Sequence, residues 1–255
     1  VKMKLSVGII TYNEEKNLSR TLDSILEMAN EIIIVDSGST DRTLEIANQY
    51  NASIYSEEWK GYGLQKNSVI DKCVGEWILL IDADEEISSE LKEKIKDIIS
   101  DSGSKKVYKP NFTAICFGKR IKHGGWSNHY RVRLFKNGAG RYNDREVHEK
   151  FITNEEIGVI KEEIYHHTYE DLEDYFNKFN RYTSESAKQY KKQNKKKAFF
   201  IFYLDSVFKF FKMYIIKMGF LDGYEGYLLA KLASFYVFIK YAKLREKKYE
   251  KNMFF

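Results

Sequence analysis

Hydrophobic and polar positions alternate between two kinds of segment in the first hundred residues. Four short apolar runs, at residues 5–11, 31–36, 53–55 and 77–81, have the length and β-branched content of buried strands. The segments between them are longer, and their apolar positions recur at the spacing of one helix face. Strands that alternate with helices in this way predict right-handed βαβ units and hence a parallel sheet.

Capping residues and periodicity predict four helices in this part of the chain. The first is expected to run from an Asn13 cap to about Ala29. Its apolar face comprises Leu18, Leu22, Ile25 and Leu26. The others are expected after the caps at residues 39–41, over residues 63–73, and from Ser88 or Ser89 to Ile99.

The alternation stops after Ser100. Residues 106–118 and 130–135 resemble strands, with a glycine-rich turn near Gly138 and Gly140, and the chain reads as helical from Asp171 onward. We therefore expect an α/β domain with a mixed sheet over residues 1–170, composed of halves 1–100 and 101–170. A helical extension is expected over residues 171–255.

Three polar clusters follow three of the predicted parallel strands. They comprise Thr11, Asn13 and Glu14; Asp36, Ser37, Ser39 and Asp41; and Asp82, Asp84 and Glu85. In parallel sheets, ligands bind beyond the carboxyl ends of the strands, so the clusters are expected to converge on one site.

The chemistry of these clusters suits a nucleotide and a hard cation. Asp82 and Asp84 can face one Mg²⁺ or Mn²⁺ ion, although paired aspartates after a strand are also common caps and turns. Asp36 can accept hydrogen bonds from a uracil or ribose, and Tyr12 can contact the base. The alternative is that Asp36 belongs to a loop whose polar residues cap the next helix, and that Asn13 only caps a helix.

Composition and charge narrow the function further. Charged residues make up 31% and hydrophobic residues 43%, which is typical of a folded protein. Cys73 and Cys116 are too few for a disulfide framework or a cysteine metal site, and they favour a reducing compartment. Residues 1–6 read as the start of a strand rather than a signal segment, so we expect a cytoplasmic protein.

The C-terminal part of the chain has the composition of a membrane-surface helix. Residues 188–197 contain six lysines and no acid, and residues 199–218 place aromatic side chains and lysines on different helix faces. No uncharged apolar stretch is long enough to span a bilayer. This pattern favours attachment to the inner face of the plasma membrane, and we expect no nucleic-acid partner. The alternatives are a solvated face and packing on the catalytic domain or in a homo-oligomer.

The polar clusters also carry a resemblance to a known family. Thr11-Tyr12-Asn13-Glu14, the Asp36–Asp41 segment and Asp82-Ala83-Asp84 resemble, in order, the motifs of family 2 glycosyltransferases, which have the GT-A fold. The resemblance implies a UDP-sugar donor and Mn²⁺ or Mg²⁺, with Asp84 as a direct ligand and Asp82 nearer the ribose or a metal-bound water. The implied donor-binding residues are Thr11, Tyr12, Asn13, Glu14, Asp36, Gln65, Lys66 and Asp82.

The second half resembles a narrower group, the bacterial lipopolysaccharide inner-core glucosyltransferases. The similar segments are residues 131–135, 145–149, 219–223 and 240–244. This resemblance implies an inverting transfer, with UDP-glucose or a similar donor, to a lipid-anchored glycan.

An inverting transfer requires a base for the acceptor hydroxyl. The Glu-Asp acceptor motif of many family members is absent, and residues 145–149 stand in its place. Candidate bases are Asp144, Glu146 and Glu149, of which we predict Glu149, with Glu146 in reserve. A strand over residues 146–151 would place Glu146 and His148 on the face opposite Glu149.

Three other polar residues, His148, Arg131 and Arg133, keep two interpretations each. His148 is predicted to contact the metal or the diphosphate, and the alternative is a structural histidine. Arg131 and Arg133 are phosphate ligands or surface charges, and His166 and His167 are expected to be structural because they lack metal-type spacing partners.

Two other functions share some of these features. A sugar-phosphate nucleotidyltransferase would have the same sheet and carboxylates, but it usually opens with a glycine-rich loop, and residues 6–15 contain only Gly8. A non-enzymatic scaffold domain that binds Mg²⁺ would use the acidic edge alone, which leaves the second acidic cluster and the long second half without a role.

Overall fold

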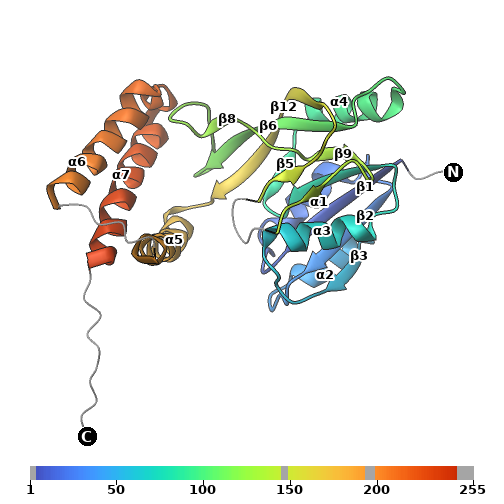
Figure 1. Ribbon diagram of the computed structural model, residues 1–255, viewed down its shortest axis with the longest axis horizontal. Helices are drawn as coiled ribbons and strands as arrows, with labels where there is room; N and C mark the ends of the chain where they lie inside the picture. The colour runs from blue at the N-terminus through green and yellow to red at the C-terminus, as the bar shows by residue number, and fades with distance from the viewer. Residues whose placement is uncertain (1–3, 145–148, 193–198, 246–255) are drawn as a thin grey trace, which may run out of the picture. The chain divides into compact units, whose positions relative to one another are not determined.

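The computed structural model describes residues 4–144, 149–192 and 199–245, and these form two compact units (Figure 1). Unit 1 comprises residues 1–114 and 128–168, and unit 2 comprises residues 115–127 and 169–255. The division into domains 1–170 and 171–255 stays a prediction.

A mixed sheet forms the centre of unit 1. Its main path has the order β3-β2-β1-β4-β9-β6-β12-β5. Strands β1 to β4 are parallel, and β9 then pairs antiparallel with both β4 and β6. In chain order the bounds of these strands are β1 (Leu5–Thr11), β2 (Glu31–Asp36), β3 (Ser53–Ser56), β4 (Trp77–Asp82), β5 (Glu85–Ile87), β6 (Val107–Cys116), β9 (Leu134–Lys136) and β12 (Ile157–Tyr169).

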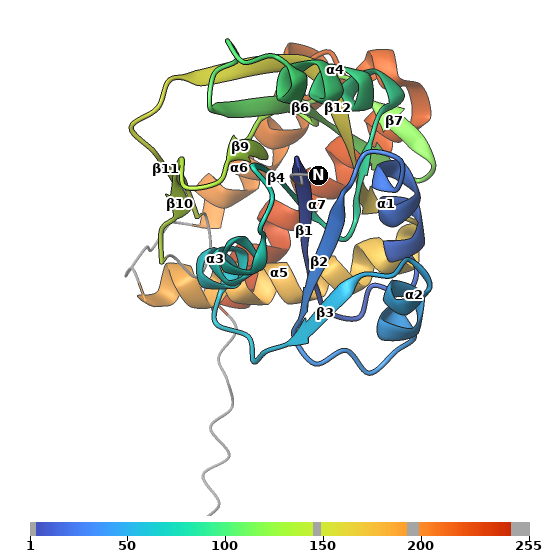
Figure 2. The ribbon, with the colours of Figure 1, turned by 90° about the vertical axis from the view of Figure 1, so that its right-hand side faces the viewer.

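Helices cover both faces of the parallel strands, because alternate strand residues are apolar on each face. On one face, Val7 and Ile9 pack with α1 (Leu18–Ile25), α2 (Thr43–Gln49) and α4 (Ser89–Ser100). On the other face, α3 (Tyr62–Lys72) packs against the strands through Val69 and Ile70. Figure 2 shows α3 on one side of β1 and β2, with α1 and α2 on the other.

The four parallel strands and the helices between them confirm the predicted pattern, but the start of the first helix was wrong. Helix α1 begins at Leu18, and Asn13 instead has a left-handed backbone with φ 54°. The Asn13 side chain accepts a hydrogen bond from the Thr40 N–H, so this residue joins two loops rather than capping a helix. Leu26, predicted on the apolar face, is 50% exposed because the helix ends at Ile25.

The antiparallel part departs further from the prediction. The strand predicted over residues 130–135 is divided into β8 (Ser127–Tyr130) and β9, and residues 131–133 lie between them. Residues 146–148 of the strand predicted over 146–151 lie outside the described residues, and β11 begins only at Phe151. The remaining short strands are β7 (Lys119–Ile121), β10 (Arg141–Tyr142) and β11 (Phe151–Ile152).

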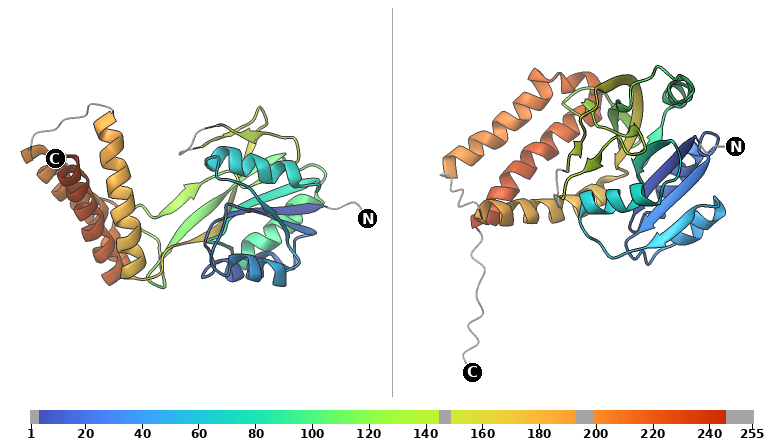
Figure 3. Two further views of the ribbon diagram at one scale, coloured as in Figure 1. Left: turned by 90° about the horizontal axis from the view of Figure 1, so that it is seen from below. Right: turned by 45° about the vertical axis from the view of Figure 1, so that its right-hand side comes forward.

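Unit 2 is a bundle of helices, as predicted from Asp171 onward. Helix α7 packs against both α5 and α6, which appear in orange to red in Figure 3. Tyr175, Phe179 and Leu232 form its small apolar core. The bounds are α5 (Leu172–Lys192), α6 (Phe199–Phe211), the π-helical turn η1 (Lys212–Ile216), the 3-10 turn η2 (Gly219–Asp222) and α7 (Gly223–Arg245).

The predicted fold class, an α/β domain with a mixed sheet and a C-terminal helical extension, is confirmed. None of the helices in the described part of the chain has both the length and the apolar character needed to cross a membrane.

Candidate active site

The carboxyl ends of β1, β2 and β4 lie side by side in unit 1. Thr11 is in register with Asp36, and Ile10 is in register with Asp82, because the three strands are parallel neighbours. The three polar clusters therefore meet at one edge of the sheet, as their positions predict.

The loops after β1 and β2 are fastened to each other by hydrogen bonds. The Asn13 N–H donates to Ser39 Oγ at 2.8 Å, and the Glu14 N–H donates to Thr43 Oγ1 at 2.8 Å. Thr11 is buried, whereas Tyr12 is 58% exposed. The two loops thus form one fixed surface that presents an accessible aromatic ring.

Asp36 shapes this surface from within. Its side chain is buried, and its carboxylate accepts hydrogen bonds from the Gly38 N–H, the Ser39 N–H and Ser39 Oγ. Gly38 has φ +90°, a conformation that residues with a Cβ rarely adopt. Asp36 therefore holds the turn in place, and its predicted contact with the nucleotide stays a prediction.

Helix α3 brings two polar side chains, Gln65 and Lys66, to the same edge. Gln65 is buried and its Nε2 donates to Ser37 Oγ at 3.3 Å, which joins α3 to the loop after β2. Lys66 is also buried, and its Nζ lies 3.3 Å from Asp82 Oδ1 and 2.8 Å from Glu149 Oε1. The ammonium group therefore bridges a predicted donor-site carboxylate and the predicted base.

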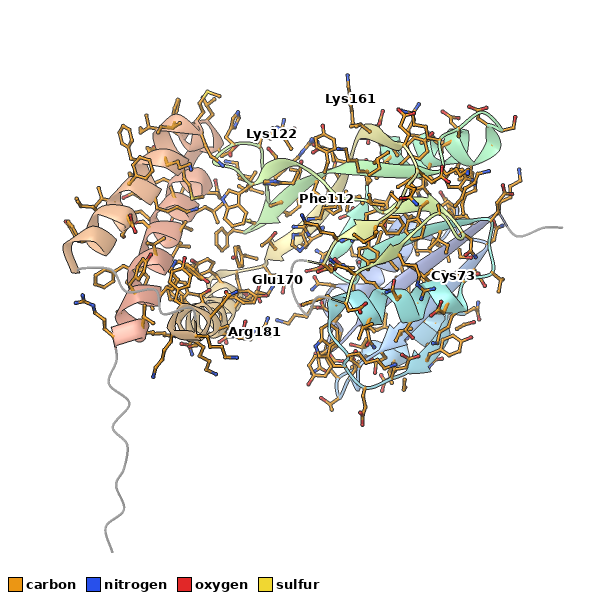
Figure 4. The ribbon with its side chains drawn as sticks, in the orientation of Figure 1. Cys73, Phe112, Lys122, Lys161, Glu170 and Arg181 are labelled. Atoms are coloured by element: carbon orange, nitrogen blue, oxygen red, sulfur yellow. The ribbon has the colours of Figure 1, made fainter. Side chains whose placement is uncertain are left out.

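Arg133 is a buried charge, whereas its position in the sequence allows either a phosphate ligand or a surface residue. Only 2% of its side chain is exposed, and its guanidinium donates to Asp82 Oδ2 and to Glu85 Oε1, each at 2.6 Å. The guanidinium carbon also lies 5.3 Å from the ring centre of Phe112, which is labelled in Figure 4. The surface-charge interpretation is therefore wrong, since Arg133 is committed to holding Asp82 and Glu85.

These positive charges give the two carboxylates opposite properties. Burial favours the neutral form of Asp82, but the charges of Arg133 and Lys66 outweigh it and lower the pKa of Asp82. Burial dominates at Glu85, which is 1% exposed, and raises its pKa despite Arg133. Asp82 is thus a stable anion at the edge of the sheet, while Glu85 is enclosed beneath it.

Asp84 faces a histidine that the sequence analysis treated as structural. His166 Nε2 lies 3.1 Å from Asp84 Oδ2, and His166 Nδ1 lies 3.1 Å from Thr168 Oγ1. Burial lowers the pKa of His166, but the Asp84 charge outweighs burial and the net shift is upward. His166 is on β12, a strand that the apolar pattern of the sequence does not predict, and no spacing in the sequence relates it to Asp84.

Asp84 and His166 fit a divalent cation. A carboxylate oxygen and an imidazole nitrogen are both common ligands of Mn²⁺, and metals in nucleotide sites take further ligands from phosphate oxygens and water. The described residues contain no group of three acidic, histidine or cysteine side chains placed to hold a metal. Any further ligand would come from the donor, from solvent or from outside the described residues, where His148 lies.

The predicted base has a defined position. Glu149 is 17% exposed and is bound to Lys66 as described above. Glu146 lies outside the described residues, as does His148, and Asp144 is exposed. Among the three candidate bases, Glu149 is therefore the one that the described residues join to Asp82, through the ammonium group of Lys66.

Comparisons with known proteins identify the family of the chain. The family model for glycosyl transferase family 2 matches residues 6–154. An uncharacterized glycosyltransferase of Rickettsia felis is 32% identical over 262 residues, covering 95% of this chain and 90% of that protein. The lipopolysaccharide core biosynthesis glycosyltransferase LpsC of Rhizobium meliloti is 31% identical over 163 residues, covering 62% of this chain and 60% of LpsC.

A solved structure, S. aureus TarS 1-349 in complex with UDP, aligns with 72% of this chain at 18% identity and a TM-score of 0.48. The alignment covers 65% of the TarS chain, which is less than two thirds. The family match extends over more than half of the chain, and the Rickettsia relative over nearly all of it. The chain therefore belongs to glycosyl transferase family 2.

Proposed function

We propose that this protein is an inverting, metal-dependent glycosyltransferase that moves a sugar, in the first instance glucose from UDP-glucose, to a lipid-linked glycan such as a lipopolysaccharide core. The observation that carries the proposal is the bridge from Asp82 through Lys66 to Glu149. It joins a carboxylate at the predicted donor site to a carboxylate at the predicted acceptor side. Family membership supports transfer over a nucleotidyltransferase or a scaffold domain.

The donor site is assigned to the carboxyl edge of the parallel strands. The interlocked loops after β1 and β2 would hold the uridine, with Tyr12 against the base and Asp36 fixing the turn beside it. Thr11, Asn13 and Glu14 contribute through the loop that they build. Gln65 supports the same surface from α3.

The metal is assigned to Asp84 and His166, with Asp82 nearby and His148 as a predicted further contact. A bound Mn²⁺ or Mg²⁺ would neutralise the negative charge that develops on the departing diphosphate. Asp82 is held as an anion by Arg133 and Lys66, so it is ready to contact the ribose or a metal-bound water without first losing a proton.

The base is assigned to Glu149, with Glu146 in reserve. In an inverting reaction the acceptor hydroxyl attacks the sugar on the side opposite the leaving diphosphate, and a carboxylate removes its proton. The hydrogen bond from Lys66 to Oε1 fixes one oxygen of Glu149 and thereby orients the carboxylate.

The relatives and the C-terminal helices support the proposed acceptor and location. The name of LpsC, a lipopolysaccharide core biosynthesis protein, supports a lipid-linked glycan acceptor. Such an acceptor would be met at the inner face of the plasma membrane by a peripheral protein in the cytoplasm. A homo-oligomer is the alternative use of the same helices.

The proposal is tested by UDP release from a panel of nucleotide sugars with Mn²⁺. We expect Asp84→Ala to lower turnover at least ~100-fold and to abolish the Mn²⁺-dependent part of UDP binding, because the metal loses a ligand. Asp97→Ala, an exposed carboxylate on α4, is the matched control and should leave both unchanged.

Three results would contradict the proposal in different ways. Full turnover in EDTA, or in Asp84→Ala, would show that transfer does not depend on a metal. Formation of pyrophosphate in place of UDP would indicate a nucleotidyltransferase. The absence of turnover with every nucleotide sugar and glycan acceptor would favour the scaffold domain.

A further inference from the structure

Helix α6 and the turn after it expose a continuous apolar stripe. Its large side chains are 44–59% exposed, although residues of this kind are normally buried. They recur at intervals of three and four residues, so they lie on one face of the helix and continue into η1. The members of this stripe are Tyr203, Leu204, Val207, Phe208, Phe211, Ile215 and Ile216.

The next turn carries apolar side chains on a tightly packed backbone. A Cβ on Gly226 would lie 1.9 Å from the Gly219 carbonyl oxygen, so the start of α7 and the turn pack backbone to backbone. The buried carboxylate of Asp222 accepts hydrogen bonds from the Lys122 N–H and the His123 N–H. The turn is thus fixed internally, which explains why the 219–223 segment has this composition.

The side chains of this turn point away from that internal packing. They are 45–68% exposed, and they comprise Met218, Phe220, Leu221 and Tyr224. Because the backbone beneath them is fixed, their exposure is a property of the fold and does not result from a loose loop.

Positive charge accompanies the stripe and the turn. Burial lowers the pKa of Lys209, and the nearby charges of Lys217, Lys212 and Lys240 lower it further. Within residues 199–245, Lys209, Lys212 and Lys217 form no ion pair with an acid. A group of like charges that is not neutralised within the described part of this unit favours an anionic partner.

We infer that the stripe and the 218–224 turn form a membrane-docking face, in which the turn enters the acyl region and the lysines bind anionic lipid phosphates. The inference rests on the proposed function, because a lipid-linked acceptor would be found at a membrane. It adds the residues that make the contact.

A second copy of this chain is a weaker candidate for this face. In a two-fold symmetric dimer the same patch lies on both subunits, so the lysines of both copies would be brought into one interface. Like charges opposed across an interface are unfavourable, whereas anionic lipids would neutralise them and also accept the apolar side chains.

The inference is tested by flotation of the full-length protein with vesicles at low salt. We expect binding to vesicles that contain phosphatidylglycerol, and at least about tenfold weaker partitioning for Phe220→Ser/Leu221→Ser, because two inserted apolar side chains are lost. The matched control is Val74→Ser/Val159→Ser, which removes exposed apolar side chains from unit 1 and should bind normally. Thermal unfolding should give equal Tm values for all these proteins.

The lysines provide an independent variant that leaves the apolar side chains intact. Lys212→Gln/Lys217→Gln should weaken binding about 25-fold at low salt, since each lysine at an anionic surface contributes about fivefold, and the difference should shrink as salt is added. Lys94→Gln/Lys161→Gln makes the same change of charge in unit 1, where Lys161 projects outward from β12 (Figure 4), and should have little effect.

Failure of this inference is distinguishable from failure of the proposed function. Absence of vesicle binding, with UDP release intact, would overturn the docking face and leave the transferase. A dimer in size-exclusion chromatography that Phe220→Ser/Leu221→Ser dissociates would assign the face to a second copy. Vesicle binding that survives both double variants would place the membrane contact elsewhere.

Discussion

Units 1 and 2 differ in which side chains they bury, since unit 1 buries several charged side chains and unit 2 exposes several apolar ones. Unit 1 encloses Lys66, Arg133 and Glu85 among apolar strands, and each of them has an ionic partner at 3.3 Å or less. Unit 2 leaves large apolar side chains such as Phe208 and Leu221 more than half exposed. Neither arrangement follows from the requirement for a stable core.

This difference indicates which part of each unit is suited to binding other molecules. Buried ion pairs contribute little net stability because desolvation offsets their attraction, but removing one partner is strongly destabilising. The proposed function gives a cluster of this kind a different role, since it would hold charged groups in fixed positions beside the donor. Exposed apolar patches of this extent mark interaction surfaces. Under the proposed function, unit 1 would carry the chemistry and unit 2 would present an interaction surface.

The largest effect is expected at Glu149, where the buried cluster reaches the predicted acceptor side. Glu149→Gln should lower the rate of transfer by ~10²–10⁴-fold while donor affinity is kept, because a carboxamide has almost the same shape but removes no proton. The measurement is the transfer rate and the dissociation constant for UDP in the same preparation.

Glu155→Gln is the matched control, since Glu155 is a carboxylate of unit 1 that pairs with Lys106 at the surface. It should transfer sugar at the normal rate. If Glu149→Gln transfers normally and Glu146→Gln is inactive, the base is Glu146 and the proposed mechanism is otherwise unchanged. If both transfer normally, the base is Asp144 or another carboxylate.

The parallel half of unit 1 was predictable because its signals are local. Strands such as Trp77–Asp82 are buried on both faces, so they appear in the sequence as short apolar runs bounded by polar residues. Strand β12 was not predicted, because its apolar residues are interrupted by Lys161, Glu162 and Glu163, and its pairing with β5 joins distant parts of the chain.

The same distinction holds for the site. The three motifs at the strand ends are contiguous in sequence and were found. The contact between His166 and Asp84 spans 82 residues, and the contact between Arg133 and Asp82 spans 51, so no periodicity or spacing indicates either. Arginine is seldom fully buried, so the sequence left Arg133 as a phosphate ligand or a surface charge and did not indicate a buried ion pair.

The next largest effect would remove the central charge of unit 1. Arg133→Met should lower the free energy of unfolding by about 3–5 kcal/mol, because it leaves Glu85 and Asp82 without their main cation. Arg131→Met is the matched control, two residues away and exposed, and should change stability by less than about 0.5 kcal/mol. Urea denaturation at pH 7 measures the free energy of unfolding of both variants. Equal values would show that the buried ion pairs of Arg133 contribute little to stability.

The smallest effect concerns Glu57, a carboxylate of unit 1 that is paired near the surface rather than enclosed. Lys72 Nζ donates to it at 2.5 Å, and Ser68 and Lys60 also donate to it. These hydrogen bonds, that of Lys72 first, lower the pKa of Glu57 from 4.5 to about 2. The folded protein therefore binds fewer protons than the unfolded chain between these values. The contribution to stability is complete above pH 4.5 and is lost as the pH falls toward 2.

We expect Glu57→Gln to lower the free energy of unfolding at pH 7 by about 1–2 kcal/mol. The full pKa difference corresponds to about 3 kcal/mol, and solvent screening at this partly exposed side chain reduces it. Urea denaturation at several pH values should show the variant and the parent protein converging as the pH is lowered from 4.5 toward 2. Glu58→Gln, at the adjacent exposed carboxylate, should stay within about 0.5 kcal/mol of the parent throughout. A Glu57→Gln effect of the same size at pH 7 and near pH 2 would mean that packing at this position, and not its charge, stabilises unit 1.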